Sequence, residues 1–372
     1  MRKQANEFAA IKSRRPAPTA LQQPRRPAPT TFYGCEFIRL FFVAPVLLLG
    51  GCNRTSTQPN APVAATDNRV TLYCSVDQEF ARPLIKRLEA KTGLQIAVLY
   101  DTEATKTAGL ANRIRAERNR PRCDVYWASA LLQTLLLSDD KLLQAFDSPA
   151  RADLPARFKG PDWTGVGVRG RLLLGSKTLS PTNLKFVPSS SKARFALSNP
   201  AFGTASDWAT AYATRSGDAS TLDFFRRLKS KGARVLPGNG DVTREVADGN
   251  LESGWADTDD YLNQKRERKP IFVARTVQNN VIVPGAASLV AGAPHEENAR
   301  KLLDALVSKE GEAALVAQMP GVFSLRRTSD KTNWKSGGED FSFLANTPQD
   351  DYAKWPATWK RIRESLAGIL TP

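Results

Sequence analysis

Histidine, cysteine and methionine are scarce in this sequence, and their scarcity excludes much common chemistry. The 372 residues include 1 His, 4 Cys and 2 Met. The single histidine, His295, lies in the stretch GAPHEEN, a polar turn ahead of a helical pattern. Histidine-based zinc sites and Ser-His-Asp triads both require a histidine in a defined constellation. Hydrolases of the common kinds are therefore disfavoured, and we expect a protein that is not an enzyme.

The cysteines are too few and too far apart for a metal or disulfide framework. None shows the C-x-x-C spacing of metal sites, and they are Cys35, Cys52, Cys74 and Cys123. Cys74 ends one predicted strand, and Cys123 begins another that we expect to lie beside it in parallel. Their offset corresponds to roughly 13 Å at ~3.3 Å per residue, beyond the ~7 Å limit between bridged Cα atoms. We therefore expect no disulfide between Cys74 and Cys123.

Long apolar runs are also missing. The run Leu40–Leu49 is far shorter than the ~20 residues that span a bilayer, but it has the length of a signal-peptide core. The sequence LGGC that ends at Cys52 resembles the lipobox of bacterial lipoproteins, which implies cleavage before Cys52 and a lipid on its sulfur. An ordinary signal peptide with a chance cysteine is the alternative. We thus predict a leader in residues 1–51, with a disordered extension or a later start codon, and a flexible tether over residues 52–68.

Acidic residues are outnumbered, with 37 Asp+Glu against 53 Lys+Arg and a net charge of +16. Such a charge raises the possibility of nucleic-acid binding. The leader region carries a disproportionate share of it, however, and the remaining basic residues are scattered among acids without a basic-aromatic motif. We therefore expect no nucleic-acid partner.

What the sequence does contain is an alternation of strand and helix patterns. The stretch RVTLYCS (69–75) predicts a strand, and the next residues predict a helix that carries Phe80, Leu84 and Leu88 on one face and stops at Gly93. Pro83 lies inside that pattern and predicts a late start or a kink. Two further strands, LQIAVLYDT (94–102) and CDVYWAS (123–129), alternate with amphipathic helices. This order predicts a parallel α/β fold.

The second part of the chain repeats the alternation after an extended, glycine-punctuated stretch at 163–176, which is suited to crossing between two lobes. Strand patterns occur in ARFALSNP, ARVLPG and LESGWADTDD, with helices between them. Further strands are expected in KPIFVA and NNVIVPGAASLVAG. One long helix is expected over HEENARKLLDALVSKEGEAALVA, and a last amphipathic helix at the C-terminus.

This order of elements resembles the type 2 extracellular solute-binding proteins of bacterial ABC importers, and in particular their ferric-iron-binding branch. The resemblance covers about residues 69–370 and is carried by RPRCDVYWA, LSNPAFGTASDW, GNGDVTREVADGNLESGWADTDD and GAPHEENARKLLDALVSKEGEAAL. It implies an α/β fold of two lobes, each a mostly parallel sheet flanked by helices, with the ligand in the cleft between them. The lobe boundaries that we predict are 69–165 with 275–330 for lobe 1, 166–274 for lobe 2, and 331–372 for a C-terminal helical segment that packs on both.

The resemblance also implies partners and a location. Such a protein captures a solute and delivers it to a membrane permease that works with an ATPase. We expect a monomer, held by its lipid on the periplasmic side of a membrane. No resident cofactor is expected, and ferric iron enters only as the transported ligand.

Ligands of open α/β sheets bind beyond the carboxyl ends of the strands, and small hydroxyl or acidic residues there begin the following helices. Free N–H groups at helix N-termini attract anions, although Ser, Thr and Asp are also common N-caps. Trp127 and Trp255 are candidates to line the cleft or to lie in the core. The predicted ligand-binding residues are Ser75, Asp77, Thr105, Trp127, Thr204, Ser206, Asn239, Asp257, Asp259 and Tyr261.

The sequence departs from the ferric-iron pattern at these turns. Relatives of that branch often place a histidine in the first turn, where this chain has Asp77, and adjacent tyrosines in the late turn, where only Tyr261 keeps a phenol. If the ligand is ferric iron, the predicted ligands are Asp77, Asp257, Asp259 and Tyr261, an oxygen-rich set that suits a hard cation. The alternatives are an anionic or organic solute, such as a phosphonate or a polyamine, and a sensor or partner protein that no longer transports.

Overall fold

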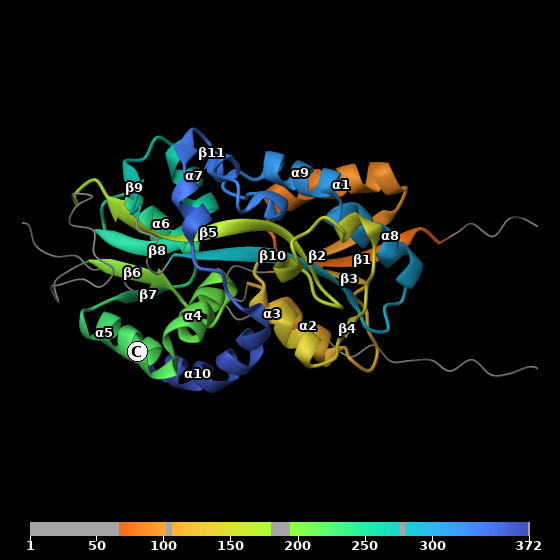
Figure 1. Ribbon diagram of the computed structural model, residues 1–372, viewed down its shortest axis with the longest axis horizontal. Coiled ribbons are helices and arrows are strands. Elements are labelled where there is room, and N and C mark those ends of the chain that lie inside the picture. Colours follow the sequence, from red (N-terminus) through yellow and green to blue (C-terminus); the bar gives the residue numbers. More distant parts are fainter. Residues whose placement is uncertain (1–66, 102–105, 180–193, 276–279, 371–372) are drawn as a thin grey trace, which may run out of the picture. The chain divides into compact units, whose positions relative to one another are not determined.

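The computed structural model describes residues 67–101, 106–179, 194–275 and 280–370, and all of them belong to one compact unit. Helices and strands alternate along most of this part of the chain (Figure 1). The strands of the large sheet are β1 (Arg69–Cys74), β2 (Gln95–Tyr100), β3 (Val125–Ala128), β4 (Leu143–Gln144), β5 (Thr164–Ser176), β6 (Phe195–Ser198), β7 (Arg234–Leu236), β8 (Ser253–Asp257), β9 (Ile271–Val273) and β10 (Val281–Val290). The α-helices are α1 (Gln78–Thr92), α2 (Ala108–Ala116), α3 (Leu132–Asp139), α4 (Gly203–Ser216), α5 (Asp218–Ser230), α6 (Asn239–Ala247), α7 (Thr258–Arg266), α8 (Glu296–Val307), α9 (Lys309–Gln318) and α10 (Trp355–Leu370).

Two parallel groups of strands are joined by two antiparallel crossing strands. The strand order is β2-β1-β3-β10-β5-β8-β6-β7, with β4 beside β10 and β9 beside β5. The pairs β1–β2, β1–β3, β6–β7 and β6–β8 are parallel, whereas β10 is antiparallel to β3 and β5, and β5 is antiparallel to β8. We call β1–β4 with α1–α3, α8 and α9 the first half, and β6–β9 with α4–α7 the second half. Figure 1 shows β5 and β10 running side by side between the halves.

The predicted mixed α/β architecture is confirmed, including the crossing at 163–176, which is β5. The predicted boundary between lobes at residues 165 and 166 falls inside this strand, because β5 pairs with strands of both halves. Each half has its own cover of helices. Residues that follow parallel strands of both halves meet beside β5.

Helix α1 illustrates how local sequence sets the elements. Its buried face carries Phe80, Leu84 and Leu88, as the spacing predicts. The helix begins at Gln78 with Pro83 inside it, so Pro83 does not delay its start. It ends at Gly93, which takes φ 71° and donates its N–H to the Glu89 carbonyl at 2.8 Å. A left-handed conformation of this kind is cheap only for glycine.

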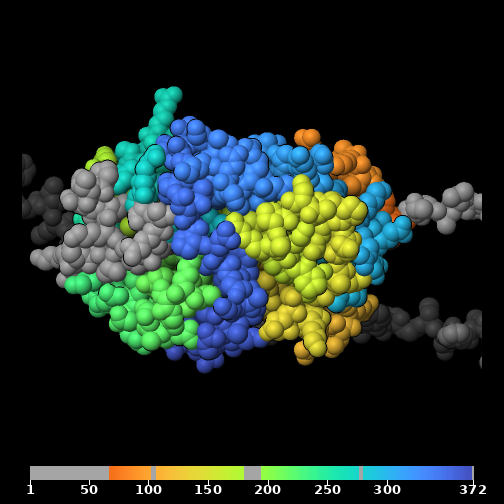
Figure 2. All heavy atoms as spheres, in the orientation of Figure 1, coloured from red at the N-terminus to blue at the C-terminus, as the bar shows by residue number. Residues whose placement is uncertain are grey.

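The segment 331–372, expected to be helical, is α-helical only in α10 among its described residues. Its earlier part consists of short 3-10 turns and the two-stranded pair β11 (Lys335–Ser336) and β12 (Glu339–Asp340). Helix α10 buries Trp355, Trp359 and Ile362 and contacts α3, α4 and α5. In Figure 2 the blue surface of α10 lies between the green surface of α4 and α5 and the yellow surface of the first half.

The long helix expected over residues 295–317 is wrong as a single element. It divides at Ser308, whose extended backbone separates α8 from α9 and whose hydroxyl accepts the Gly311 N–H at 3.0 Å. The hydroxyl thus caps a new helix, a role that competes with helix continuation at serine.

The remaining predictions on the chain's ends and cysteines have mixed outcomes. Cys74 and Cys123 are free and buried, and the register places Trp127 opposite Cys74. Cys52, the leader and nearly all of the tether lie outside the described residues. Within the described residues, no helix combines the length and apolar character that crossing a bilayer requires.

Candidate ligand-binding site

A small cavity lies where the carboxyl ends of strands from both halves meet. Its volume is about 40 Å³, room for roughly three water-sized groups. The first half contributes the turns after β1 and β3 and Lys106, two residues before α2, and the second half contributes the N-termini of α4, α6 and α7. The lining residues are Asp77, Lys106, Ser129, Arg169, Ser198, Asn199, Phe202, Gly203, Thr204, Ala205, Pro237, Gly238, Asn239, Gly240, Asp259 and Asp260.

Two arginines of β5 form the charged floor of this region. Arg169 and Arg171 are two residues apart in a strand, so both side chains project from the same face. Both are buried. The guanidinium of Arg171 lies 5.4 Å from the centre of the Trp208 ring, within cation–π range. Buried guanidinium groups require partners, and each arginine makes its shortest ion pair with a different aspartate at the start of α7, although Arg169 also lies 3.9 Å from Asp257.

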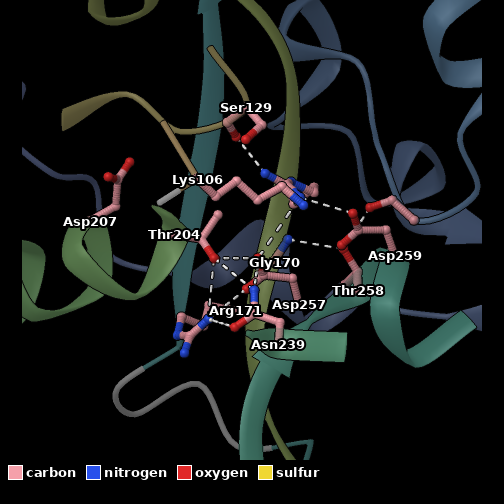
Figure 3. A network of polar contacts seen from close by, with 12 residues as sticks. Lys106, Ser129, Gly170, Arg171, Thr204, Asp207, Asn239, Asp257, Thr258 and Asp259 are labelled. Carbon is pink, nitrogen blue, oxygen red and sulfur yellow. Dashed lines mark hydrogen bonds and ion pairs between the residues drawn. The ribbon is translucent and has the colours of Figure 1, made fainter. Parts of the chain in front are cut away.

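Asp257 is the hub of a buried polar network below the cavity (Figure 3). Arg171 Nη1 donates to Asp257 Oδ1 at 3.0 Å. The second carboxylate oxygen, Oδ2, accepts from Thr204 Oγ1 at 2.5 Å and from Asn239 Nδ2 at 2.9 Å. Asp257 is fully buried. Both carboxylate oxygens therefore have protein partners, and the network ties β5 to the N-termini of α4, α6 and α7.

Asp259 is less completely satisfied. Its Oδ2 accepts from Arg169 Nη1 at 2.9 Å, while Arg169 also donates to the Ser129 carbonyl of the first half. Asp259 Oδ1 is buried and has no hydrogen-bond partner. Burial raises the pKa of Asp259, although the charge of Arg169 acts in the opposite direction. An acceptor that is both buried and unpartnered is costly unless something binds it.

Asp77, Asp260 and Lys106 complete the charged lining. Lys106 Nζ pairs with Asp77 Oδ1 at 2.6 Å. Burial, together with the charges of Asp259 and Asp257, raises the pKa of Asp260 well above its ordinary value. The charged residues that line the cavity are thus Lys106 and Asp77 of the first half, Arg169 of β5, and Asp259 and Asp260 of the second half.

A close backbone approach fixes the start of α7. The Gly321 carbonyl accepts from Thr258 Oγ1 at 2.5 Å, and a Cβ at Gly321 would lie 2.5 Å from the Asp259 nitrogen. Gly321 also takes φ 86°, a conformation that other residues adopt only with strain. A glycine is therefore required at this point if Asp259 is to face Arg169.

Asp207 connects the halves beside the cavity. Its carboxylate, in α4, accepts the N–H groups of Leu131 at 2.7 Å and Leu132 at 3.2 Å, at the N-terminus of α3. Burial raises the pKa of Asp207 to about 8, while the two N–H donors act in the opposite direction. The Gly203 N–H donates to the Lys106 carbonyl at 3.2 Å, a second bond between the halves.

The structure brings together five of the predicted site residues. Asp77, Thr204, Asn239 and Asp259 line the cavity, and Asp257 lies directly behind them. Ser75 is buried one layer away, where its hydroxyl accepts the Ser129 N–H at 2.8 Å. Thr105 lies outside the described residues.

The other three predicted residues do not reach the cavity. Ser206 donates its hydroxyl to the Gly203 carbonyl within α4. Trp127 is fully buried in the core of the first half. Tyr261 packs edge-on against Phe341. Burial raises the pKa of the Tyr261 hydroxyl, and the charge of Glu339 and its hydrogen bond with that hydroxyl raise it further.

Sequence reasoning missed Lys106, Arg169, Arg171 and Asp260. A signal was present for the arginines: charged residues at alternate positions of the apolar stretch GVGVRGRLLLGS predict two buried charges on one strand face. Lys106 and Asp260 carry no comparable pattern, because single charged residues near helix starts are common on surfaces.

The acidic group is also a candidate for metal binding. Carboxylate oxygens of Asp257, Asp259 and Asp260 lie within 4.8 Å of one another. Oxygen ligands of this kind suit a hard cation. Arg169 and Arg171 already occupy one oxygen each of Asp259 and Asp257, however, and Tyr261 points elsewhere, so the geometry supplies only part of the predicted metal set.

Comparisons with known proteins give the family. The profile of the family described as bacterial extracellular solute-binding protein matches residues 70–318. The major ferric iron-binding protein of Neisseria meningitidis is 23% identical over 267 residues, which are 67% of this chain and 78% of that protein.

Solved structures share the fold. Iron-bound HitA from Pseudomonas aeruginosa has a TM-score of 0.68 at 18% identity and covers 81% of this chain and 99% of its own. The periplasmic binding protein AfuA from Actinobacillus pleuropneumoniae, with fructose-6-phosphate bound, has a TM-score of 0.68 at 19% identity. The match covers 81% of this chain and 98% of the AfuA chain. A cavity between two α/β halves, a fold shared with two-lobed periplasmic binding proteins and a profile match over most of the described chain lead to one conclusion: the chain belongs to the family of bacterial extracellular solute-binding proteins.

Proposed function

We propose that this chain is the substrate-binding component of an ABC importer and that it captures a small solute with an oxyanion group between its halves. It would then deliver the solute to a membrane permease and its ATPase. The observation that carries this proposal is the convergence of the N-termini of α4 and α6 on one cavity. The protein acts as a monomer, held by a lipid on Cys52 on the periplasmic side of a membrane.

Helix N-termini favour an oxyanion because their first N–H groups have no acceptor within the helix. They also carry the positive end of the helix dipole. Residues 203–205 and 238–240 line the cavity, and Lys106 and Arg169 stand beside them. The sugar phosphate in AfuA supports the same class of ligand on this fold.

A calorimetric titration tests the proposal. We expect the purified protein to bind at least one of inorganic phosphate, sulfate and short carboxylates with a saturable, one-to-one isotherm. Lys106→Met keeps the length of the side chain and removes its charge, so we expect it to weaken that binding by about tenfold, the effect of ~1.4 kcal/mol. Lys265→Met, at an exposed ion pair with Glu339, is the matched control. No binding of any oxyanion by the wild-type protein would refute the proposal.

Ferric iron is a second candidate, favoured by the three clustered carboxylates and by the ferric iron-binding protein of Neisseria meningitidis. It requires the metal to compete with Arg169 and Arg171 for Asp259 and Asp257. Metal analysis of the protein after incubation with a ferric chelate and desalting separates the candidates. One equivalent of retained iron that disappears in Asp259→Asn would favour iron over the oxyanion.

A further inference from the structure

The cations around the cavity are already matched by carboxylates. Lys106 pairs with Asp77 at 2.6 Å. Arg169 pairs with Asp259 at 2.9 Å. Arg171 pairs with Asp257 at 3.0 Å. A solute that carried only negative charge would have to share these partners, and its attraction would come mainly from the helix N-termini.

A fourth carboxylate, Asp260, is left over. None of the hydrogen bonds or ion pairs among the described residues involves its side chain. Its Oδ1 lies 4.0 Å from the position that a Cβ would take at Gly240, so the carboxyl group stands over the N-terminus of α6 at the cavity. Asp259, only 4% exposed, adds a second acceptor there, because its Oδ1 has no partner.

These two observations are independent, and both indicate a missing positive donor. One is the excess of one carboxylate over the cations among the described residues in and behind the cavity, and the other is the unpartnered oxygen of Asp259. The raised pKa of Asp260, caused first by burial and then by the charges of Asp259 and Asp257, agrees with this. Asp259 is buried and Asp260 is partly buried. A carboxylate that has lost hydration is stable when it is paired, when it is protonated or when a bound cation compensates it.

We propose that the solute is a small amino-oxyanion, whose anionic group lies at the N-termini of α4 and α6 and whose ammonium group binds Asp259 and Asp260. This inference rests on the proposed function and narrows its substrate class. An ammonium group has three donors and one positive charge, so it satisfies Asp259 Oδ1 and Asp260 together. A hydroxyl group has one donor and no charge, and it leaves the excess carboxylate uncompensated.

The size of the cavity favours a short solute. A volume of about 40 Å³ holds roughly three water-sized groups, fewer than the non-hydrogen atoms of a small amino-oxyanion. Such a solute therefore requires the halves to separate slightly, and a longer or bulkier solute would require a wider separation.

Matched probe compounds test this inference. The first set is phosphoethanolamine, 2-hydroxyethyl phosphate and inorganic phosphate, and the second is β-alanine, 3-hydroxypropionate and propionate. We expect the amine of at least one set to bind the wild-type protein ten times or more tightly than its hydroxyl analogue. Calorimetric titration at fixed ionic strength gives each dissociation constant.

Asp260→Asn sharpens the result because it removes a charge from an unpaired side chain. In this variant we expect the amine and its hydroxyl analogue to bind with dissociation constants within about threefold of each other. The anion without an amine should bind as tightly as it binds the wild-type protein, or more tightly. Asp223→Asn, in an exposed pair with Arg227 on α5, should retain the full preference and serves as the control for charge change alone.

The possible failures are distinguishable. Equal affinity for the amine and hydroxyl compounds would overturn this inference and leave the oxyanion site standing. An equal loss of affinity for all compounds in Asp260→Asn would also overturn it, because Asp260 would then not recognise the amine. If no probe binds but a ferric chelate does, the proposed oxyanion site itself fails, and the inference falls with it.

Discussion

Arg169 and Arg171 lie two residues apart on β5, and each forms an ion pair with an aspartate. The two pairs differ in whether both oxygens of the carboxylate have hydrogen-bond partners. Asp257, paired with Arg171, has partners on both oxygens and no contact with solvent. Asp259, paired with Arg169, faces the cavity with one oxygen unpartnered. A buried carboxylate with partners on both oxygens holds structure together, whereas a carboxylate with one unpartnered oxygen at a cavity is suited to binding. The acidic stretch GWADTDDY therefore combines a structural aspartate with two that we propose bind the solute.

The largest effect should come from breaking the Arg171–Asp257 pair. Arg171→Met leaves Asp257 buried with only the more distant Arg169, at 3.9 Å, as a countercharge, and breaking buried pairs typically costs about 3–5 kcal/mol of unfolding free energy. Urea unfolding of the unliganded protein measures this cost. The double variant Arg171→Met/Asp257→Leu, which removes both charges, should recover part of the loss. If Arg171→Met leaves stability within ~0.5 kcal/mol of wild type, Asp257 is not the structural hub.

Asp207 extends the comparison to a buried carboxylate that backbone N–H groups hold. Its pKa is raised to about 8, so the folded protein binds a proton there that the unfolded chain, with a pKa of about 4, has released. The free energy of unfolding should therefore fall as pH rises from about 4 to about 8. Asp207→Asn should lack this part of the slope. Urea unfolding at pH 5, 6.5 and 8 tests this, and parallel slopes in both proteins would contradict it.

A smaller change in the unfolding free energy, a gain and not a loss, is expected when Asp260 is replaced. Asp260→Asn removes repulsion with Asp259 and Asp257, so the unliganded protein should become more stable at pH 7 by about 0.5 kcal/mol, the order found for close like charges. Because the folded-state pKa of Asp260 is raised, the gain should be greater at pH 8 than at pH 5. A loss of stability at pH 8 would show that Asp260 has a structural partner.

The smallest effect on folding should come from Cys52→Ser. If Cys52 carries the lipid, this variant should release the protein from the membrane without changing its unfolding free energy, since the residue precedes the folded unit. Membrane fractionation with urea unfolding of the released protein tests both parts. Full retention of the Ser variant in the membrane fraction would refute the lipid anchor.

The sequence by itself determined most of the elements and the family. Apolar spacing and the left-handed glycine at Gly93 set α1, because these signals act over only a few residues. Polar residues at the ends of strands predicted where the cavity lies, since parallel strands end at one edge. Asp77, Thr204, Asn239 and Asp259 were found in this way.

The tertiary structure alone decided which aspartate meets which arginine. The antiparallel register of β5 with β8 sets Arg171 opposite Asp257, residues that are far apart in the chain. Tyr261 turned away because α7 begins at Thr258, and two residues of a helix rotate a side chain by about 200° from Asp259. Local patterns therefore place side chains near a site, but pairing across the sheet and the phase of each helix decide which of them face it.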